Sequence, residues 1–271
     1  ESEIRRFILE NDYLEAIVAL PTDIFFRTGI GTYIWLISNR KPEQRKGKVQ
    51  LIDATGMGAS MRKNEGNKRK FIDQSSIDKI SRIYADFEQS SVSKIFDYTD
   101  FGYRRVKVLR PLRIDIQFDN EKLALLKESK DFCKLSNDEQ TVLLSSINAL
   151  LNQSKDYAWF EGEFLPNLAF KKISKGLKNT LITIFGVPNP DADVVVIDDE
   201  VQMDSNLTDY ENIPLNQEID AYMAKEVLPH APDAVIDTTY TDSKDGQVGV
   251  VGYEINFNRY FYKFEQPRHP N

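Results

Sequence analysis

The chain has 271 residues, 41% of them hydrophobic, a share that suits a globular protein with a buried core and argues against disorder. Lys and Arg number 35 against 42 Asp and Glu, which gives a formal net charge of -7. The single cysteine, Cys133, leaves no intramolecular disulfide to form, and there is no apolar run of about 18 residues to span a bilayer. We therefore expect a soluble, cytoplasmic protein. The chain opens on a helix start, without an initiator methionine or signal peptide, and we expect a fragment of something longer.

The charge is unevenly distributed along the chain. Residues 40–113 carry 18 Lys and Arg against 9 Asp and Glu, whereas residues 189–271 carry 5 against 17. A basic segment inside an acidic protein attracts phosphate backbones locally. The acidic end suits a basic protein partner, or solubility alone.

The first 54 residues predict one helix and three strands. Ser2 can cap a helix that runs to about Asn11. Residues 14–20 and 32–37 are short, almost continuously apolar runs, the pattern of strands covered on both faces, and residues 48–54 predict a third strand. One helix can cover only one face of such a sheet. This segment is therefore predicted to be one end of an α/β sheet whose other strands lie upstream of Glu1.

Residues 55–120 predict a loop, a helix and an extended arm. Residues 55–74 contain three glycines and the cluster Lys68-Arg69-Lys70, which indicates an exposed basic loop. Ser75 or Ser76 then caps a helix. Its buried face would consist of Ile77, Ile80, Ile83, Tyr84 and Phe87. Residues 103–116 alternate in part and include Pro111, so we expect an edge strand or an irregular arm.

The remaining chain predicts a mainly helical region at 121–186 and an acidic α+β tail at 187–271. Leu123, Leu125 and Leu126 lie in one helix, Ser136-Asn137-Asp138-Glu139 forms a capping box for a second, and residues 166–185 suggest a third. In the tail we expect a helix from near Pro214 to before Pro229, then a strand pair at residues 248–257 and 260–264. The expected divisions of the chain are therefore 1–54, 55–120, 121–186 and 187–271.

Four features of the sequence resemble functional motifs but do not indicate a catalytic or binding site. Gly29-Ile30-Gly31 leads into a strand, whereas a phosphate-binding loop leads from a strand into a helix. Asn189-Pro190-Asp191 lacks the second proline and the aromatic ring of an Asn-Pro-Pro-aromatic motif, which favours a turn. His230 and His269 have no partner at catalytic or metal-ligand spacing, and Asp198-Asp199-Glu200 is better explained as surface carboxylates than as a cation site. These residues alone give no catalytic mechanism.

A set of segments nevertheless forms a recognisable signature. In the N-terminal part these are Glu1-Ser2-Glu3-Ile4-Arg5-Arg6, Leu14-Glu15-Ala16-Ile17-Val18-Ala19-Leu20-Pro21-Thr22-Asp23, Ser38-Asn39-Arg40-Lys41-Pro42 and Asp100-Phe101-Gly102-Tyr103-Arg104-Arg105. In the C-terminal part they are Glu211-Asn212-Ile213-Pro214-Leu215, Glu226-Val227-Leu228-Pro229-His230-Ala231-Pro232 and Gly252-Tyr253-Glu254-Ile255. Together they resemble the modification subunit of type I restriction-modification systems, a family of adenine-N6 DNA methyltransferases that use S-adenosylmethionine.

The resemblance implies a fold and an absence. Residues 1–54 would be the terminal part of a Rossmann-like methyltransferase sheet, with residues 32–37 as its antiparallel strand. The family's cofactor-binding glycine motif and catalytic Asn-Pro-Pro-aromatic motif lie upstream of the segment that matches Glu1. We therefore expect no catalytic or cofactor-binding residue in this chain, and poor binding of S-adenosylmethionine by the isolated polypeptide.

The resemblance also implies contacts with DNA. Enzymes that modify a base in duplex DNA flip it out and hold it against aromatic or apolar faces. Phe25, and less so Phe26, is the candidate for that contact, and packing of both rings as core is the alternative. Basic side chains would contact the DNA backbone without reading sequence. They are Arg27, Arg40, Lys41, Arg45, Lys46, Arg62, Lys63, Lys68, Arg69 and Lys70. A solvated basic loop is the competing interpretation.

The resemblance also implies protein partners. The resemblance implies assembly with a specificity subunit, which would recognise most of the DNA sequence, and with a restriction subunit. Residues 121–271 would mainly hold these partners. The alternative is that the whole chain is a non-catalytic nucleic-acid-binding or assembly module, and an Asn-Pro-Pro-Phe or Asn-Pro-Pro-Tyr motif upstream would decide for the enzyme.

Overall fold

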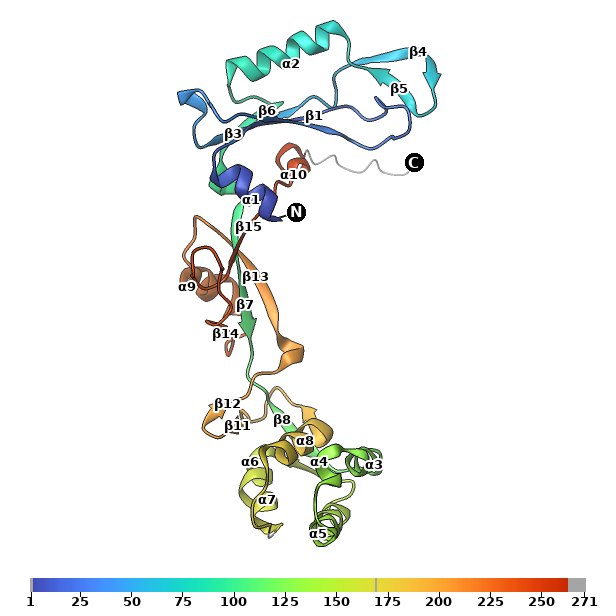
Figure 1. The fold of residues 1–271 in the computed structure, drawn as a ribbon, viewed down its shortest axis with the longest axis vertical. Coiled ribbons are helices and arrows are strands. Elements are labelled where there is room, and N and C mark those ends of the chain that lie inside the picture. Colours follow the sequence, from blue (N-terminus) through green and yellow to red (C-terminus); the bar gives the residue numbers. More distant parts are fainter. Residues whose placement is uncertain (1, 169, 263–271) are drawn as a thin grey trace, which may run out of the picture. The chain divides into compact units, whose positions relative to one another are not determined.

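The chain folds as a mixture of helices and several small sheets, as predicted (Figure 1). The structure is a computed structural model that describes residues 2–168 and 170–262. It divides into two compact units: unit 1 is residues 1–106, 210–226 and 238–271, and unit 2 is residues 107–209 and 227–237. Unit 1 therefore combines segments from the N-terminal and C-terminal parts of the described chain. No helix in the described ranges is both long and apolar enough to cross a membrane.

Unit 1 is built around a four-stranded sheet in the order β2-β1-β3-β6. These strands are β1 (Leu14–Ala19), β2 (Tyr33–Ile37), β3 (Lys48–Asp53) and β6 (Ser93–Asp97). The pair β1–β3 is parallel, with Val18 opposite Ile52, and β1–β2 and β3–β6 are antiparallel. The other elements of unit 1 are α1 (Ser2–Glu10), η1 (Glu43–Arg45), β4 (Ala59–Glu65), β5 (Lys68–Phe71), α2 (Gln74–Asp86), η2 (Tyr98–Phe101), most of β7 (Gly102–Leu109), β13 (Asp209–Pro214), α9 (Ile219–Tyr222), η5 (Met223–Val227), β15 (Val250–Tyr253) and α10 (Phe257–Phe261).

The two faces of the sheet are covered by segments from opposite ends of the chain. On one face Val18 and Ile52 pack against Ile80 and Ile83 of α2. On the other face Leu14, Ile17, Val49 and Leu51 pack with Leu9 of α1 and with Val251, Tyr253 and Phe257. Figure 1 shows α2 on one side of the sheet and α1 and α10 on the other. All six residues of β1 are buried, so the prediction for this strand is confirmed.

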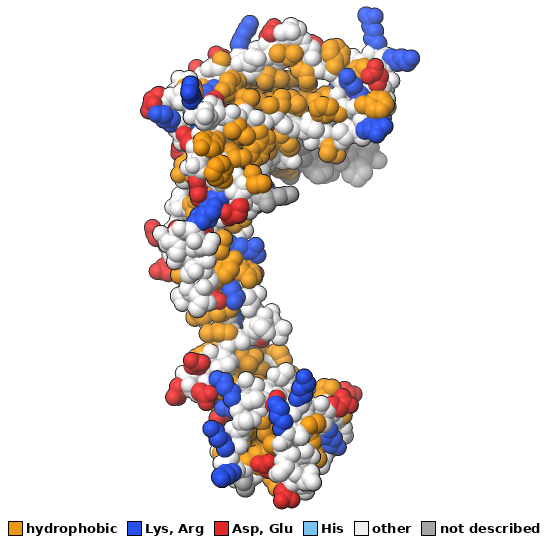
Figure 2. Space-filling view, in the orientation of Figure 1, with side chains coloured by type: hydrophobic (Ala, Val, Ile, Leu, Met, Phe, Trp, Pro, Cys, Tyr) orange, Lys and Arg blue, Asp and Glu red, His pale blue; other side chains and the backbone are white. Residues whose placement is uncertain are grey.

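Strand β2 differs from its prediction, because it is largely exposed. Ile34 is 45% exposed, Trp35 38% and Ile37 55%. β2 is the outermost strand of the sheet, and no other strand in the described ranges pairs with its free edge. A cavity of about 440 Å³, lined in part by Tyr33, Trp35 and Phe257, opens beside it. In Figure 2 hydrophobic side chains run as a band across the body that carries α2 and β1. An apolar strand of this kind lacks a covering layer.

Two further predictions in residues 55–120 were wrong. Residues 55–74 do not form a loop, because β4 and β5 pair as an antiparallel hairpin. Residues 103–116 contain an interior strand instead of an edge strand: β7 lies between β13 and β14 (Val235–Ile236) and also pairs with β15. The helix α2 is present, but its cap is Asp73, which accepts a hydrogen bond from the Ser76 N–H. Ile77, placed on its buried face by prediction, is 44% exposed.

Several acidic residues in the C-terminal part of the chain pair with basic residues. In unit 1, Asp242 bonds to Arg6 at 2.6 Å and Asp245 to Arg104 at 2.7 Å. In unit 2, Asp233 lies within 3.3 Å of both Arg110 and Arg113, and Asp237 pairs with Lys107. The uneven charge seen along the sequence is thus partly neutralised inside each unit.

The predicted C-terminal strand pair was also wrong. β15 pairs with β7, and Tyr260 lies in the helix α10 instead of a strand. Phe264, the end of that prediction, lies outside the described residues, as does His269. The predicted helix after Pro214 is confirmed as α9 and the π-helical η5.

Unit 2 is mainly helical, as predicted for residues 121–186. Its helices are α3 (Asn120–Glu128), α4 (Lys130–Cys133), α5 (Asn137–Asn148), α6 (Tyr157–Trp159), η3 (Phe160–Phe164), α7 (Leu165–Asn167), α8 (Lys175–Phe185) and η4 (Ser205–Leu207). Short strands complete it: β8 (Ile114–Gln117), β9 (Ser154–Asp156), β10 (Gly186–Pro188), β11 (Val196–Ile197), β12 (Glu200–Val201) and β14. The predicted capping box at Ser136 and Glu139 is confirmed. The predicted helix at 166–185 is interrupted, and α8 begins after its own cap, Ser174.

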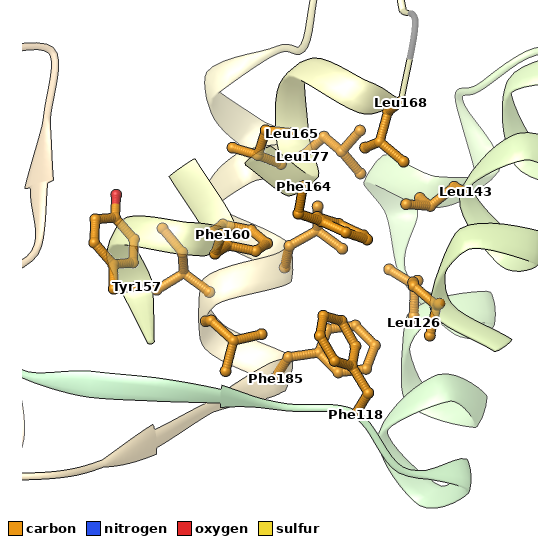
Figure 3. Close-up of a cluster of buried hydrophobic side chains, with 14 of the residues drawn as sticks. Phe118, Leu126, Leu143, Tyr157, Phe160, Phe164, Leu165, Leu168, Leu177 and Phe185 are labelled. Atoms are coloured by element: carbon orange, nitrogen blue, oxygen red, sulfur yellow. The ribbon is translucent and has the colours of Figure 1, made fainter. Parts of the chain in front are cut away.

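The helices of unit 2 share one apolar core. Phe118, Phe160, Phe164 and Phe185 lie at its centre, and all four are at most 4% exposed (Figure 3). Neighbouring rings lie 5.2–5.5 Å apart, a separation typical of favourable aromatic pairs. Most apolar residues of α3 and α5 are used in this core, and Leu125 and Val142 are left exposed.

Candidate nucleic-acid interface

The loop between β1 and β2, residues 20–32, carries both aromatic candidates and is anchored at its base. The Leu20 N–H donates to the Thr32 carbonyl at 2.9 Å, and Ile24 packs against the apolar layer between the sheet and α2. Phe25 and Thr28 form an isolated antiparallel bridge. This anchoring leaves Phe25 49% exposed and Phe26 57% exposed. Neither ring is buried, so the alternative in which both form core does not describe this structure.

The β4–β5 hairpin meets this loop directly. The Asn67 N–H donates to the Phe26 carbonyl at 3.1 Å, and the N–H groups of Arg69 and Lys70 donate to the Asp23 carbonyl at 2.8 and 3.0 Å. Two segments that are separate in the sequence therefore form one surface. We call this surface the loop–hairpin surface, and it consists of residues 22–31 and 59–71.

Six of the predicted DNA-backbone residues lie on the loop–hairpin surface. They are Arg27, Arg62, Lys63, Lys68, Arg69 and Lys70. Arg27, Arg62, Lys63 and Arg69 are exposed, and Lys68 and Lys70 are half-buried. Within residues 2–168 and 170–262, none of the six forms an ion pair with a carboxylate, whereas Lys46 pairs with Glu43 at 2.7 Å. Positive charge without an internal partner, beside exposed aromatic rings, suits a nucleic-acid backbone and an unstacked base.

Two predicted backbone contacts were wrong, because their charges serve the protein interior. The Lys41 side chain is 2% exposed and bonds to Asp12 and to the Leu14 and Lys48 carbonyls. Arg45 is 3% exposed; it donates to Gln50 Oε1 at 3.1 Å and to the Tyr84 carbonyl. Its guanidinium also lies 4.0 Å from the Tyr84 ring centroid. Neither side chain is available to DNA.

The last two predicted contacts are exposed but lie elsewhere. Arg40 follows the C-terminal end of β2 and Lys46 precedes β3, whereas the loop–hairpin surface joins the opposite ends of these strands. Of the ten predicted residues, the structure therefore brings six together on the loop–hairpin surface. It buries two others, and it exposes the last two at the opposite end of the strands.

Two other motifs lie in turns. Asp191 donates its N–H to Asn189 Oδ1 at 3.0 Å, which makes Asn189-Pro190-Asp191 a turn. Asp198 and Asp199 have φ of 53° and 63° and form the tight turn between β11 and β12. No three His, Cys, Asp or Glu side chains in the described part of the chain gather as a metal site.

Comparison with known proteins bears out the resemblance. Residues 1–101 match the family model of N-6 DNA methylases. The chain is similar to type I methylase subunits. It is 28% identical over 145 residues to the type I restriction enzyme MjaVII methylase subunit of Methanocaldococcus jannaschii, covering 53% of this chain and 25% of that protein. The MjaIX methylase subunit of the same organism is 26% identical over 168 residues, covering 56% of this chain and 29% of that subunit. The chain thus spans about a quarter of the length of these curated relatives.

Two further likenesses are shorter. The type I restriction enzyme HindI methylase subunit of Haemophilus influenzae is 43% identical over 58 residues, which cover 21% of this chain and 13% of that subunit. This chain is also similar to a solved structure, the type I restriction-modification system methyltransferase subunit from Streptococcus thermophilus. The match covers 36% of this chain and 19% of the solved chain, at 24% sequence identity and a TM-score of 0.31. A score that low does not relate the two folds in detail.

Methylases of this family use S-adenosylmethionine, and the residues present here do not fit that cofactor. A cofactor loop of this type needs a glycine turn that leads from a strand into a helix. Gly29 and Gly31 lead into β2, and Gly56 and Gly58 join β3 to β4. No strand–glycine–helix turn of this type occurs in the described ranges.

Sequence reasoning missed the residues that assemble the loop–hairpin surface. Asp23 and Asn67 act through their backbone groups, and Gly66 lies at the hairpin turn. The run Asn64-Glu65-Gly66-Asn67 between two polar segments is a hairpin signal, but the flanking residues lack the apolar alternation that predicts strands.

Proposed function

We propose that this chain is part of a type I methylase subunit that transfers a methyl group from S-adenosylmethionine to adenine N6 in DNA. The chain supplies contacts to the target base and to the DNA backbone, and the rest of the subunit supplies the cofactor and catalytic groups. The observation that carries this proposal is the loop–hairpin surface, where exposed Phe25 and Phe26 stand beside six basic side chains that form no ion pair within the described residues.

The exposed β2 strand supports the view that more protein belongs to this sheet. Its apolar side chains and its free edge are costly to leave in water, and an unpaired edge strand promotes aggregation. In a complete subunit, a further strand would pair with the β2 edge and cover Ile34 and Trp35. The relatives, about four times as long as the matched segment, contain enough chain for this.

Roles on the loop–hairpin surface follow from chemistry. Phe25 would stack on the flipped base, a contact worth about 1–3 kcal/mol that offsets part of the cost of unstacking. Arg27, Arg62, Lys63, Lys68, Arg69 and Lys70 would hold phosphates and set the register of the duplex without reading its sequence. Lys41 and Arg45 are left out of this proposal because they are buried.

A specificity subunit and a restriction subunit are the proposed protein partners. The family relationship supports this assembly, and residues 121–271 are the proposed docking region. Because the helices of unit 2 mostly use their apolar residues in their own core, Leu125 and Val142 are the exposed apolar side chains on α3 and α5 for such a contact.

The test is methyl transfer by the complete subunit assembled with its partners. Phe25→Ala should lower methyl transfer by roughly 5-fold to 100-fold, the value of one lost base stack. Phe7 is a matched control because it is 56% exposed on α1, away from the loop, and Phe7→Ala should leave the rate within about twofold. Equal losses in both variants, or loss of folding in Phe25→Ala, would assign Phe25 to structure.

A further inference from the structure

The hairpin and the aromatic loop are joined by backbone groups, which makes their connection independent of side-chain conformation. Three N–H groups of the hairpin, from Asn67, Arg69 and Lys70, donate to the carbonyls of Phe26 and Asp23. These bonds use only the backbone of Arg69 and Lys70, and within the described ranges neither side chain forms an ion pair with a carboxylate. A duplex held by these side chains would therefore fix the position of the loop at the same time.

Gly66 lies where the hairpin passes close to Phe26. A Cβ atom at Gly66 would lie 2.9 Å from the Phe26 carbonyl oxygen and 3.3 Å from its ring atom Cε2. The first distance is to backbone, so a rotation of a side chain cannot relieve it. Gly66 also has φ of +60°, a conformation that residues with a Cβ adopt at a cost. Glycine is the residue that fits both requirements.

The two phenylalanines are held differently. The Phe26 carbonyl accepts a hydrogen bond from the Asn67 N–H, and its ring lies where a Cβ at Gly66 would come within 3.3 Å of it. Phe25 takes part in the bridge with Thr28 through its backbone, and its ring forms no aromatic or cation contact within residues 2–168 and 170–262. The backbone of Phe26 is therefore bound to the hairpin, whereas Phe25 is 49% exposed and its backbone is bound within its own loop.

We propose that the β4–β5 hairpin is a positioning element for base capture, and that Gly66 is its key residue. By holding Phe26, the hairpin fixes the loop so that the Phe25 ring is presented to the extrahelical adenine. Gly66 touches neither DNA nor cofactor and acts through Phe26 and the loop. This inference rests on the proposed function, because it concerns the same surface.

Gly66→Ala tests the inference, with Gly246→Ala as the matched control. Gly246 has a similar φ of +70° but no atom within 4 Å of its added Cβ, so it shares the backbone strain without the contact. In the 271-residue chain, hydrogen exchange at Asn67, Arg69 and Lys70 should become faster in Gly66→Ala, while β1 and β3 stay protected. Unchanged exchange at these three amides would overturn the inference.

The complete subunit supplies the functional readouts. With 2-aminopurine in place of the methylated adenine, Gly66→Ala should lose most of the fluorescence increase that reports a flipped base, and methyl transfer should fall roughly 5-fold or more. Gly246→Ala should stay within about twofold of the wild type. Normal flipping and normal methyl transfer in Gly66→Ala would refute the positioning role.

A double variant separates this role from a general structural one. If Gly66 acts through the loop that presents Phe25, adding Gly66→Ala to Phe25→Ala should lower methyl transfer no further. Independent, multiplying losses would contradict the inference. A wild-type subunit that transfers no methyl group to DNA would instead refute the proposed function, so the two failures are distinguishable.

Discussion

The buried ion pair between Arg6 and Asp242 offers the sharpest test of how unit 1 is held together. Arg6 Nη1 lies 2.6 Å from Asp242 Oδ2, with the two side chains 5% and 1% exposed. Asp242 also accepts hydrogen bonds from the backbone N–H groups of Lys244 and Val251 at 2.7 and 2.8 Å. Asp242→Ala removes the carboxylate that accepts from the Arg6 guanidinium and from the N–H groups of Lys244 and Val251 at a buried site. We predict that it lowers the free energy of unfolding by about 3–5 kcal/mol.

The same contact predicts a pH dependence. Burial opposes ionisation of Asp242, but the N–H groups of Lys244 and Val251 and the Arg6 guanidinium outweigh it and lower its pKa from 3.8 to about 2. Because the folded-state pKa lies below the unfolded one, this stabilisation is fully present above the unfolded value and is lost as the pH falls from about 4 to 2. The pH-dependent part is about 2 kcal/mol, and Asp242→Ala should lack it.

Urea unfolding measures both effects. Trp35 lies in unit 1 and Trp159 in unit 2, so Trp159→Phe leaves tryptophan fluorescence that reports on unit 1. Glu3→Gln is the control: Glu3 pairs with Lys244 at 2.6 Å between the same helix and the same loop, but the two side chains are 61% and 47% exposed. It should cost at most about 1 kcal/mol. Equal losses in Asp242→Ala and Glu3→Gln would refute the reasoning.

Three further variants separate folding from DNA binding and from assembly. Arg45→Ala should lower the free energy of unfolding by about 2–4 kcal/mol, because Arg45 loses its stacking on Tyr84 and its buried hydrogen bonds, and should leave the DNA affinity of the folded fraction unchanged. Arg69→Ala should leave the urea midpoint unchanged and weaken DNA binding measured by fluorescence anisotropy. The slope of log DNA affinity against log salt concentration should become shallower by about 1, the value of one lost phosphate contact. Ile34→Lys should leave the 271-residue chain folded by circular dichroism, since Ile34 is 45% exposed, but prevent folding of the complete subunit; a folded, active Ile34→Lys subunit would contradict the proposed covering of β2.

Local signals in the sequence were sufficient for several elements. The apolar runs of β1 and β3, the capping box at Ser136 and the helical character of residues 121–186 all depend on neighbours within a few residues. The family resemblance predicts the contact of Phe25 with a target base. The run of basic residues in the sequence predicts the nearby basic cluster. These two features were predicted separately, and their contact through Asp23 and Phe26 was not.

Features set by distant residues could not be predicted. The sequence of an apolar strand does not show whether the strand is covered or lies at a sheet edge. The apolar run of β2 therefore predicts a buried strand. Arg45 and Lys41 were expected at the surface because charged residues are rarely buried without partners, and their partners Gln50, Tyr84 and Asp12 are invisible as such in a sequence. The pairing of β7 with β15 joins residues about 150 positions apart, beyond any local pattern.

The order in which the chain is made has a consequence for unit 1. Val251, Tyr253 and Phe257, which cover one face of its sheet, are synthesised about 200 residues after β3. All of unit 2, residues 107–209 and 227–237, is synthesised in the interval, and its core lies within residues 114–197. Domains generally fold as they emerge, so unit 2 can be complete while Leu14, Ile17 and Leu51 still face solvent. A message truncated before the codon for Val250 would therefore yield a polypeptide in which unit 2 is folded and the sheet of unit 1 is aggregation-prone.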